Sequence, residues 1–346
     1  MNFKMKNRIN LENFNIRTDL IIDEPAKMPP LKKNIISDNL TISEITLKKE
    51  DTKVLNKKEG TYITLEFNDI TNHEDRIEIE KYLSLEIKKI LTKMNIKKTD
   101  ECLIVGLGNK DSTADSLGPI TLEKILVTRH LFLLDVQTKK GIRPTAAIKP
   151  GVMANTGIET SDIILSLVEK IKPKFLIAID ALASSSIERI NKTIQLTDTG
   201  IHPGSGIGNN RKEISQKTIG IPVIAIGVPT VVESATLVND TIDYLFKHLS
   251  YLKTHTDENK LILNRDAKHY RKEIETYSLT PKEKEELTGI LGTIDDNEKK
   301  RLIIEVLNNI GYNMIVTPKE IDFLIEKLSQ TIANAINQSI HQEEIF

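Results

Sequence analysis

The chain has 346 residues, of which 39% are hydrophobic and 28% charged. That length and composition allow a packed core in one large α/β domain or in two ordinary ones. With 48 basic and 49 acidic residues the formal net charge is -1. Such a balanced chain has no global field that draws it to nucleic acid or to an anionic membrane. Its one cysteine, Cys102, excludes a disulfide framework within the chain.

The N-terminal part of the sequence shows no targeting segment. No stretch of the chain approaches the roughly 20 apolar residues that span a bilayer. Residues 1–15 are polar and basic and lack the continuous apolar run of a signal peptide. We therefore expect a cytoplasmic protein with no membrane partner. Residues 1–34 are expected to be poorly structured, because Pro25, Pro29 and Pro30 interrupt any helix or central strand.

Periodicity predicts the elements that follow. Alternating apolar residues predict strands at 40–49 and 61–67, each with one face open to solvent. A helical stripe covers 74–94. Short apolar runs at 102–109, 175–180 and 223–228, and a shorter one at 193–196, predict further strands. Helices are expected at 116–127, 163–171, 236–249, 296–308 and 318–339, the last starting at the Thr-Pro-Lys-Glu sequence 317–320.

This alternation of strands and helices predicts an α/β fold with a mainly parallel sheet and helices on both faces. Residues 254–281 are polar and weakly patterned, which indicates a linker or an exposed excursion. The sequence contains no internal repeat and no low-complexity tract.

The first motif with chemical potential is Gly106-Leu107-Gly108-Asn109, which follows a predicted strand and precedes Asp115. Glycines at such a turn let the backbone bend sharply and approach a ligand. A dinucleotide fingerprint is the obvious alternative, but its third glycine falls where Asp111 stands. A phosphate-binding Walker loop also fails, because no Gly-Lys-Ser/Thr follows.

The second motif is Asp180, which ends the apolar run 175–180. We expect it at the carboxyl edge of the sheet, where open α/β folds bind their ligands. If Asp115 lies beside it, the two carboxyl groups can share one proton, so that one acts as acid and the other as base. Such a pair can activate water against a peptide carbonyl. An Asp after a strand is also a common helix cap or turn former, so the residues alone leave both interpretations open.

The third motif is the polar, glycine-rich segment 197–212, which carries His202. As a loop after a strand it can line the same edge of the sheet. Asp115, Asp180 and His202 together make a plausible set of metal ligands. His202 can equally be an ordinary loop residue bonded to backbone groups, so a metal site stays an alternative and no cofactor is predicted.

Eight stretches of the chain resemble the bacterial spore germination protease family, whose members degrade small acid-soluble spore proteins. The matching segments are LIVGLGN (103–109), VTRHLF (127–132), PGVM (150–153), TGIETSD (156–162), AIDALA (178–183), DTGIHPGSG (198–206), PVIAIGVPTVV (222–232) and VTPKE (316–320). They span nearly the whole sequence. The resemblance implies an endopeptidase of aspartic type that depends on two aspartates, and their positions here are Asp115 and Asp180.

The resemblance also implies a fold similar to that of hydrogenase maturation proteases, which place a carboxylate after a similar glycine-containing strand. Around the first aspartate this chain departs from the family pattern, with Ala114 and Ser116 in place of proline and alanine. Those fold relatives bind a metal, which keeps a metallopeptidase using Asp115, Asp180 and His202 as an alternative. A non-catalytic module that binds spore proteins is a second alternative.

The family is made as a zymogen that removes its own N-terminal propeptide. By resemblance the cut lies between Asp19 and Leu20, so residues 1–19 are expected to be a propeptide and 20–346 a single α/β peptidase domain. Ile16 stands where the family's cleavage motif prefers an acidic residue. The resemblance further implies a homotetramer in the forespore and spore core, with small acid-soluble spore proteins as substrates and no direct contact with nucleic acid.

Overall fold

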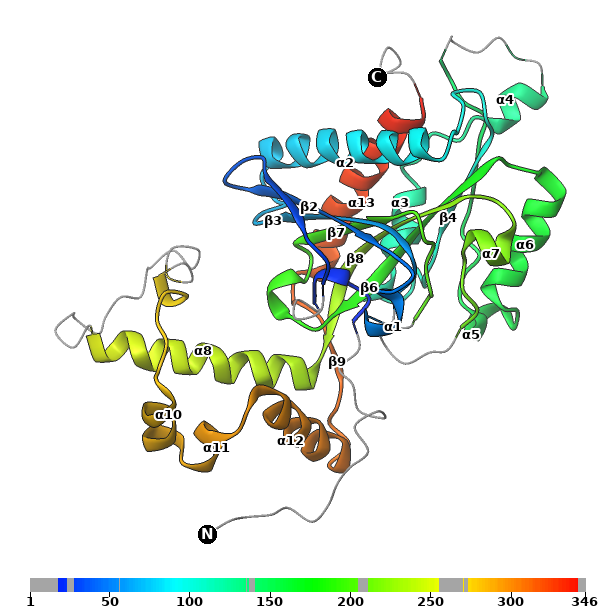
Figure 1. Cartoon of the computed structure of the whole chain (residues 1–346). Helices are drawn as coiled ribbons and strands as arrows, with labels where there is room; N and C mark the ends of the chain where they lie inside the picture. Colours follow the sequence, from blue (N-terminus) through cyan, green and yellow to red (C-terminus); the bar gives the residue numbers. More distant parts are fainter. Residues whose placement is uncertain are drawn as a thin grey trace. The chain divides into compact units, whose positions relative to one another are not determined.

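Figure 1 shows a computed structural model of the chain, which describes residues 18–23, 28–55, 57–134, 136, 141–204, 211–254, 270 and 273–341. These residues divide between two compact units. The larger lies within residues 17–232 and 317–346, and the smaller within 233–316.

The larger unit is built on a sheet whose strands follow the order β1-β2-β3-β7-β8-β6-β4-β5. Strands β5, β4, β6 and β8 are parallel, whereas β8, β7, β3, β2 and β1 pair antiparallel in turn. The bounds are β1 Lys32–Ile35, β2 Leu40–Leu47, β3 Gly60–Phe67, β4 Cys102–Gly106, β5 Thr145–Ile148, β6 Phe175–Ser184, β7 Thr193–Thr197 and β8 Val223–Glu233.

The predicted α/β class is confirmed, but the prediction of a mainly parallel sheet is wrong, because the sheet is mixed. A short connection, residues 36–39, joins β1 to β2, and a connection of that length favours antiparallel neighbours. The alternating sequence pattern of β2 and β3 is typical of antiparallel strands, but β3 is almost entirely buried, so the predicted open face is wrong for that strand. The continuous apolar runs predicted at 102–109, 175–180 and 223–228 form β4, β6 and β8 of the parallel half.

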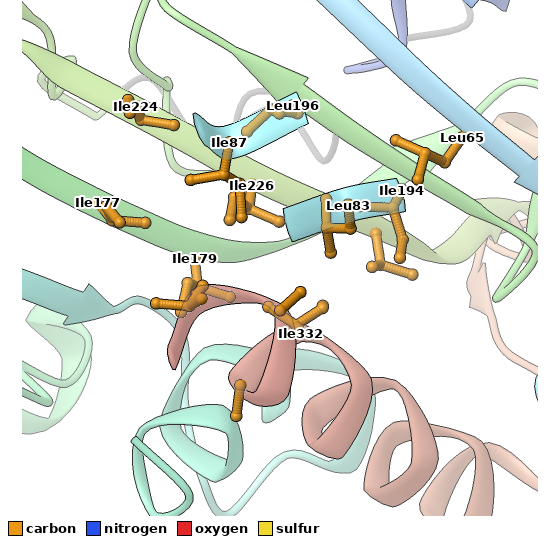
Figure 2. Packing of buried hydrophobic residues seen from close by; sticks show 14 of the residues in the cluster. Leu65, Leu83, Ile87, Ile177, Ile179, Ile194, Leu196, Ile224, Ile226 and Ile332 are labelled. Atoms are coloured by element: carbon orange, nitrogen blue, oxygen red, sulfur yellow. The ribbon is translucent and has the colours of Figure 1, made fainter. Parts of the chain in front are cut away.

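Helices lie on both faces of the parallel half. On one face α13 (Ile321–Ile340) contacts α2 (His73–Lys93) and α3 (Leu117–Leu122). Figure 2 shows residues of α2 and α13 meeting strand residues in the largest apolar cluster. The other helical segments of the unit are α1 Thr52–Leu55, α4 Arg129–Leu133, α5 Met153–Thr156, α6 Thr160–Ile171 and α7 Gln216–Ile219, with short 3-10 turns at Ile21–Asp23, Thr113–Asp115 and Ile187–Arg189.

The alternation of side chains along β6 assigns each residue to one face. Phe175, Ile177 and Ile179 enter the cluster beneath α2 and α13. Leu176 and Ala178 enter a second cluster with Ile164, Val168 and Ile219 of α6 and α7. A third cluster, on the antiparallel half, contains Leu20, Ile21, Ile22, Ile45, Leu47, Leu55, Tyr62 and Leu182.

Two predicted element ends differ from the structure. Strand β6 does not stop at Asp180 but runs to Ser184, so Asp180 lies within a strand. Helix α13 begins at Ile321 and not at Pro318. The Thr317 hydroxyl, predicted to cap the helix, donates instead to the Thr230 carbonyl at 2.8 Å. A tertiary hydrogen bond therefore takes the place of the helix cap that the local sequence predicts.

The smaller unit is helical, with α8 Ser234–Thr254, α10 Pro281–Thr288, α11 Ile290–Thr293, α12 Asp296–Asn309 and the short strand β9 Ile315–Val316. Helices predicted at 236–249 and 296–308 are confirmed by α8 and α12. Helix α10 begins with a capping box between Thr280 and Glu283. Most of the predicted excursion, 255–269, lies outside the described residues. None of the described helices is long and apolar enough to cross a membrane.

Candidate active site

Asp180 lies in the middle of the sheet on β6, where it pairs in register with Gly227 of β8. Its side chain is only 4% exposed. The carboxylate accepts a hydrogen bond from the backbone N–H of Ala181 at 3.0 Å. Because β6 alternates, Asp180 shares a face with Ala178 and Leu182, between the two smaller apolar clusters.

Asp115 comes from the 3-10 turn that follows β4. The backbone N–H of Asn109 donates to the Asp115 carboxylate at 2.9 Å and to its carbonyl at 3.0 Å. Gly108 has a φ of 103°, and a Cβ there would stand 2.1 Å from the Asp115 carbonyl oxygen. The predicted Gly108-Asn109 turn thus holds the first aspartate directly, and only glycine permits its close approach.

A second glycine contact joins the Asp115 loop to the strand that carries Asp180. A Cβ on Gly118, at the start of α3, would lie 2.3 Å from the Leu107 carbonyl oxygen and 2.6 Å from the Ile179 carbonyl oxygen. A Cβ on Gly106 would lie 2.5 Å from the Gly118 carbonyl oxygen. The Leu107 N–H also donates to the Ile179 carbonyl at 2.8 Å. Helix α3, β4 and β6 are therefore in backbone contact one residue before Asp180.

The two aspartates interact electrostatically. Burial raises the pKa of Asp180 well above its usual value, and the negative charges of Asp115 and Asp19 raise it further. Burial also raises the pKa of Asp115 to about 6, against the opposing effects of the Asn109 N–H and the charge of Arg211. Two carboxyl groups in such surroundings do not both ionise readily near neutral pH, which suits an acid and base pair.

The predicted cleavage position lies next to this pair. The Asp19 N–H donates to the Ala183 carbonyl at 3.0 Å, and the Ala183 N–H donates back to the Asp19 carboxylate at 2.9 Å. Leu20 is fully buried in the third apolar cluster. The side chain of Gln195 on β7 also reaches this segment.

Sequence reasoning missed Ala183, Gln195 and Thr230 as parts of this region. A signal for Gln195 exists, because it is a long polar side chain inside a short strand that is otherwise Thr, Ile and Leu. Ala183 acts through backbone groups only, and the Thr230 hydroxyl donates to the Ala114 carbonyl beside Asp115. A pattern of residue types predicts neither a backbone hydrogen bond between distant segments nor a hydroxyl bond to a distant carbonyl.

His202 does not join the two aspartates as a ligand set. Its Nε2 atom lies 3.0 Å from the carboxylate of Glu213, which also pairs with Lys58. Burial and the nearby Lys58 and Lys57 lower the pKa of His202, while Glu213 opposes this effect. Within the described part of the chain no group of three or more His, Cys, Asp or Glu side chains is arranged to hold a metal ion. The geometry thus lends the metal alternative no support.

Comparisons with known proteins identify the family of the chain. The family model described as germination protease matches residues 29–344. Germination proteases of Bacillus mycoides and Bacillus cereus are each 42% identical over 356 residues, covering 98% of this chain and 97% of the relative. The germination protease of a Geobacillus species is 42% identical over 361 residues with the same coverage. The chain therefore belongs to the germination protease family.

Proposed function

We propose that this protease is an aspartic-type endopeptidase that starts the degradation of small acid-soluble spore proteins during germination. The proposal rests on one observation above all, the electrostatic coupling of two carboxyl groups whose pKa values burial raises. Names of the curated relatives support the role in germination. The short segment 18–23 bound beside Asp180 supports a peptide substrate.

The two carboxyl groups divide the chemistry according to their surroundings. Asp115, with a pKa of about 6, is mostly ionised at neutral pH and takes a proton from the attacking water. Asp180 is more deeply buried and keeps its proton, so it donates a hydrogen bond to the scissile carbonyl oxygen and then transfers the proton. The water oxygen bonds to the carbonyl carbon. As the C–N bond breaks, the leaving nitrogen takes the proton that Asp115 received from the water, and the hydroxyl formed from the carbonyl returns its proton to Asp180.

The same chemistry applied to this chain's own N-terminal segment removes residues 1–19. We place the scissile bond between Asp19 and Leu20, which makes the longer chain a zymogen and 20–346 the mature peptidase domain. The glycine-assisted placement of Asp115 after β4 supports a fold similar to that of hydrogenase maturation proteases. Family membership supports a homotetramer that works in the forespore and spore core.

Asparagine substitution of each aspartate tests this function. Asp115→Asn and Asp180→Asn preserve side-chain size but remove the ability to exchange a proton. We expect each variant to lose both self-processing and cleavage of a purified small acid-soluble spore protein, as followed by mass spectrometry of the fragments. Thermal unfolding of both variants must remain cooperative, and full activity in either folded variant would refute the proposed pair.

A chelation experiment separates this mechanism from the metallopeptidase alternative. The enzyme is dialysed against a chelator and its metal content measured. Undiminished cleavage in a metal-free sample fits the aspartate pair, while loss of cleavage with recovery on metal addition supports a metallopeptidase.

A further inference from the structure

One side chain bonds to both sides of the peptide bond that the proposed self-processing cuts. The Gln195 amide nitrogen lies 3.2 Å from the Asp19 carbonyl oxygen, and the Ile21 N–H donates to the Gln195 amide oxygen at 2.8 Å. A carbonyl only accepts and an N–H only donates, so these two partners fix the orientation of the amide. Gln195 is 7% exposed, so both bonds lie away from bulk water.

The sheet places Gln195 in one row with Asp180. Gln195 on β7 and Asp180 on β6 both pair with Gly227 on β8, which lies between them. Register partners on neighbouring strands point to the same face of a sheet. Gly227 contributes no side chain to that face, and the Leu182 side chain covers it, with its Cδ1 atom 2.4 Å from where a Cβ on Gly227 would stand.

Ala183 fixes the bound segment along the strand. Its reciprocal bonds with the Asp19 N–H and carboxylate hold the residue before the scissile bond. Fully buried Leu20 holds the residue after it. With Asp19 and Leu20 both anchored, the carbonyl between them is directed to Gln195, and the negative charge of the Asp19 carboxylate helps to raise the pKa of Asp180.

We infer that Gln195 is the residue that binds the scissile carbonyl oxygen and aligns the peptide for cleavage, in self-processing and in the cleavage of spore-protein substrates. This rests on the proposed function, which assigns the cut to the Asp19–Leu20 bond. As water adds to the carbonyl carbon, negative charge develops on the oxygen that Gln195 already contacts. A donor fixed in advance at that oxygen stabilises the transition state more than the ground state.

The amide oxygen of Gln195 has a separate task. By accepting from the N–H of the second residue after the cut, it holds the leaving strand in register. Substrates therefore need a free N–H at that position, and proline there prevents cleavage. The acidic side chain before the cut is bound by the Ala183 N–H in the same arrangement.

Two nearly isosteric substitutions test this role. Gln195→Met removes both the donor and the acceptor, and we expect self-processing to slow on the order of 100-fold, the usual effect of losing one oxyanion donor. Gln195→Glu keeps an acceptor and regains a donor only when protonated. The ratio of the Glu variant's rate to the parent's rate should therefore rise as the pH is lowered. Both rates come from mass spectrometry of the intact chain.

Thr64→Val is the matched control. Thr64 is the cross-strand partner of Gln195 on β3 and is 1% exposed, and among the described residues its buried hydroxyl has no hydrogen-bond partner. Its substitution removes a buried polar atom beside Gln195 but none of the hydrogen bonds to Asp19 or Ile21, so processing should proceed at the parent's rate. If the Met variant fails to unfold cooperatively, the Glu variant alone decides.

The outcomes separate this inference from the proposed function. The role of Gln195 is overturned if the folded Gln195→Met variant processes itself at the parent's rate. It is also overturned if the ratio of the Glu variant's rate to the parent's rate does not change with pH. A parent chain that never loses residues 1–19 contradicts the proposed self-processing instead. In that case the role of Gln195 is tested with chains that start at Leu20, by measuring their cleavage of a small acid-soluble spore protein. A lower kcat with a nearly unchanged KM for the Met variant supports the role of Gln195.

Discussion

At the scale of single residues, burial and neighbouring charge give two chemically identical side chains different properties. Asp180 is enclosed within a central strand, and its pKa rises well above the usual range. Asp115 sits in a turn, accepts a backbone hydrogen bond and has a pKa of about 6. A carboxyl that is ionised near neutral pH beside one that remains protonated is what acid and base catalysis of peptide hydrolysis needs.

The pH dependence of cleavage follows from these directions. The proposed mechanism requires an ionised Asp115 and a protonated Asp180, so kcat/KM of the processed enzyme should rise as the pH passes about 6, the pKa of Asp115. It should fall again at higher pH, where Asp180 loses its proton. A peptide substrate without titratable groups in this range isolates the enzyme's own profile. A rate that is flat between about pH 5 and pH 7 would contradict this assignment.

At the scale of elements, a hydrogen-bond relay ties the Asp115 loop to the sheet. The Thr317 hydroxyl donates to the Thr230 carbonyl, and the Thr230 hydroxyl donates to the Ala114 carbonyl at 2.7 Å. Thr230 lies on β8 and is fully buried. The residue that could have capped α13 thus supports the strand that holds the loop.

Thr230→Val tests that support. The variant keeps the β-branched shape but deprives the Ala114 carbonyl of its hydroxyl donor, at a cost of about 1–3 kcal/mol in the free energy of unfolding. Because the Asp115 loop loosens, kcat should fall more than KM rises. Thr331→Val is the control, since Thr331 is fully buried and its hydroxyl has no hydrogen-bond partner in the described part of the chain. Equal effects of the two substitutions on kcat would show that the relay does not position Asp115.

At the scale of the whole molecule, the smaller unit carries exposed apolar side chains that its own helices do not cover. Along α12 and just after it, Val306 is 55% exposed and Ile310 56% exposed, and their spacing puts them on one helical face. The inner face of α13, by contrast, is buried within the larger unit. Helix α12 is therefore a better candidate than α13 for the interface of the proposed tetramer.

Charged substitutions on α12 test this assignment. The double variant Val306→Asp and Ile310→Asp should shift the sedimentation coefficient from that of a tetramer to that of smaller species, because burying two unpaired carboxylates in an apolar contact is unfavourable. Asn308→Asp adds a charge at an exposed polar position and should leave the assembly intact. A tetramer that persists in the double variant would exclude this face from the interface.

The sequence by itself determined the α/β class, most of the strands and helices, and the family, and it supplied the two aspartates of the proposed mechanism. Its continuous apolar runs and helical stripes are local patterns. Such patterns predict whether a segment is a strand or a helix, whichever elements later pack against it. The Gly108-Asn109 turn was recognisable for the same reason, since a glycine pair after a strand has few other uses.

Tertiary structure alone decided the mixed sheet, the inclusion of Asp180 within β6, and the contacts of Gln195 and Ala183 with Asp19. Strand direction depends on which strands become neighbours, which no single strand encodes. The row of Asp180, Gly227 and Gln195 joins three distant segments through register alone. Burial raises the pKa of both aspartates, but the extent of that burial follows only from how the elements pack.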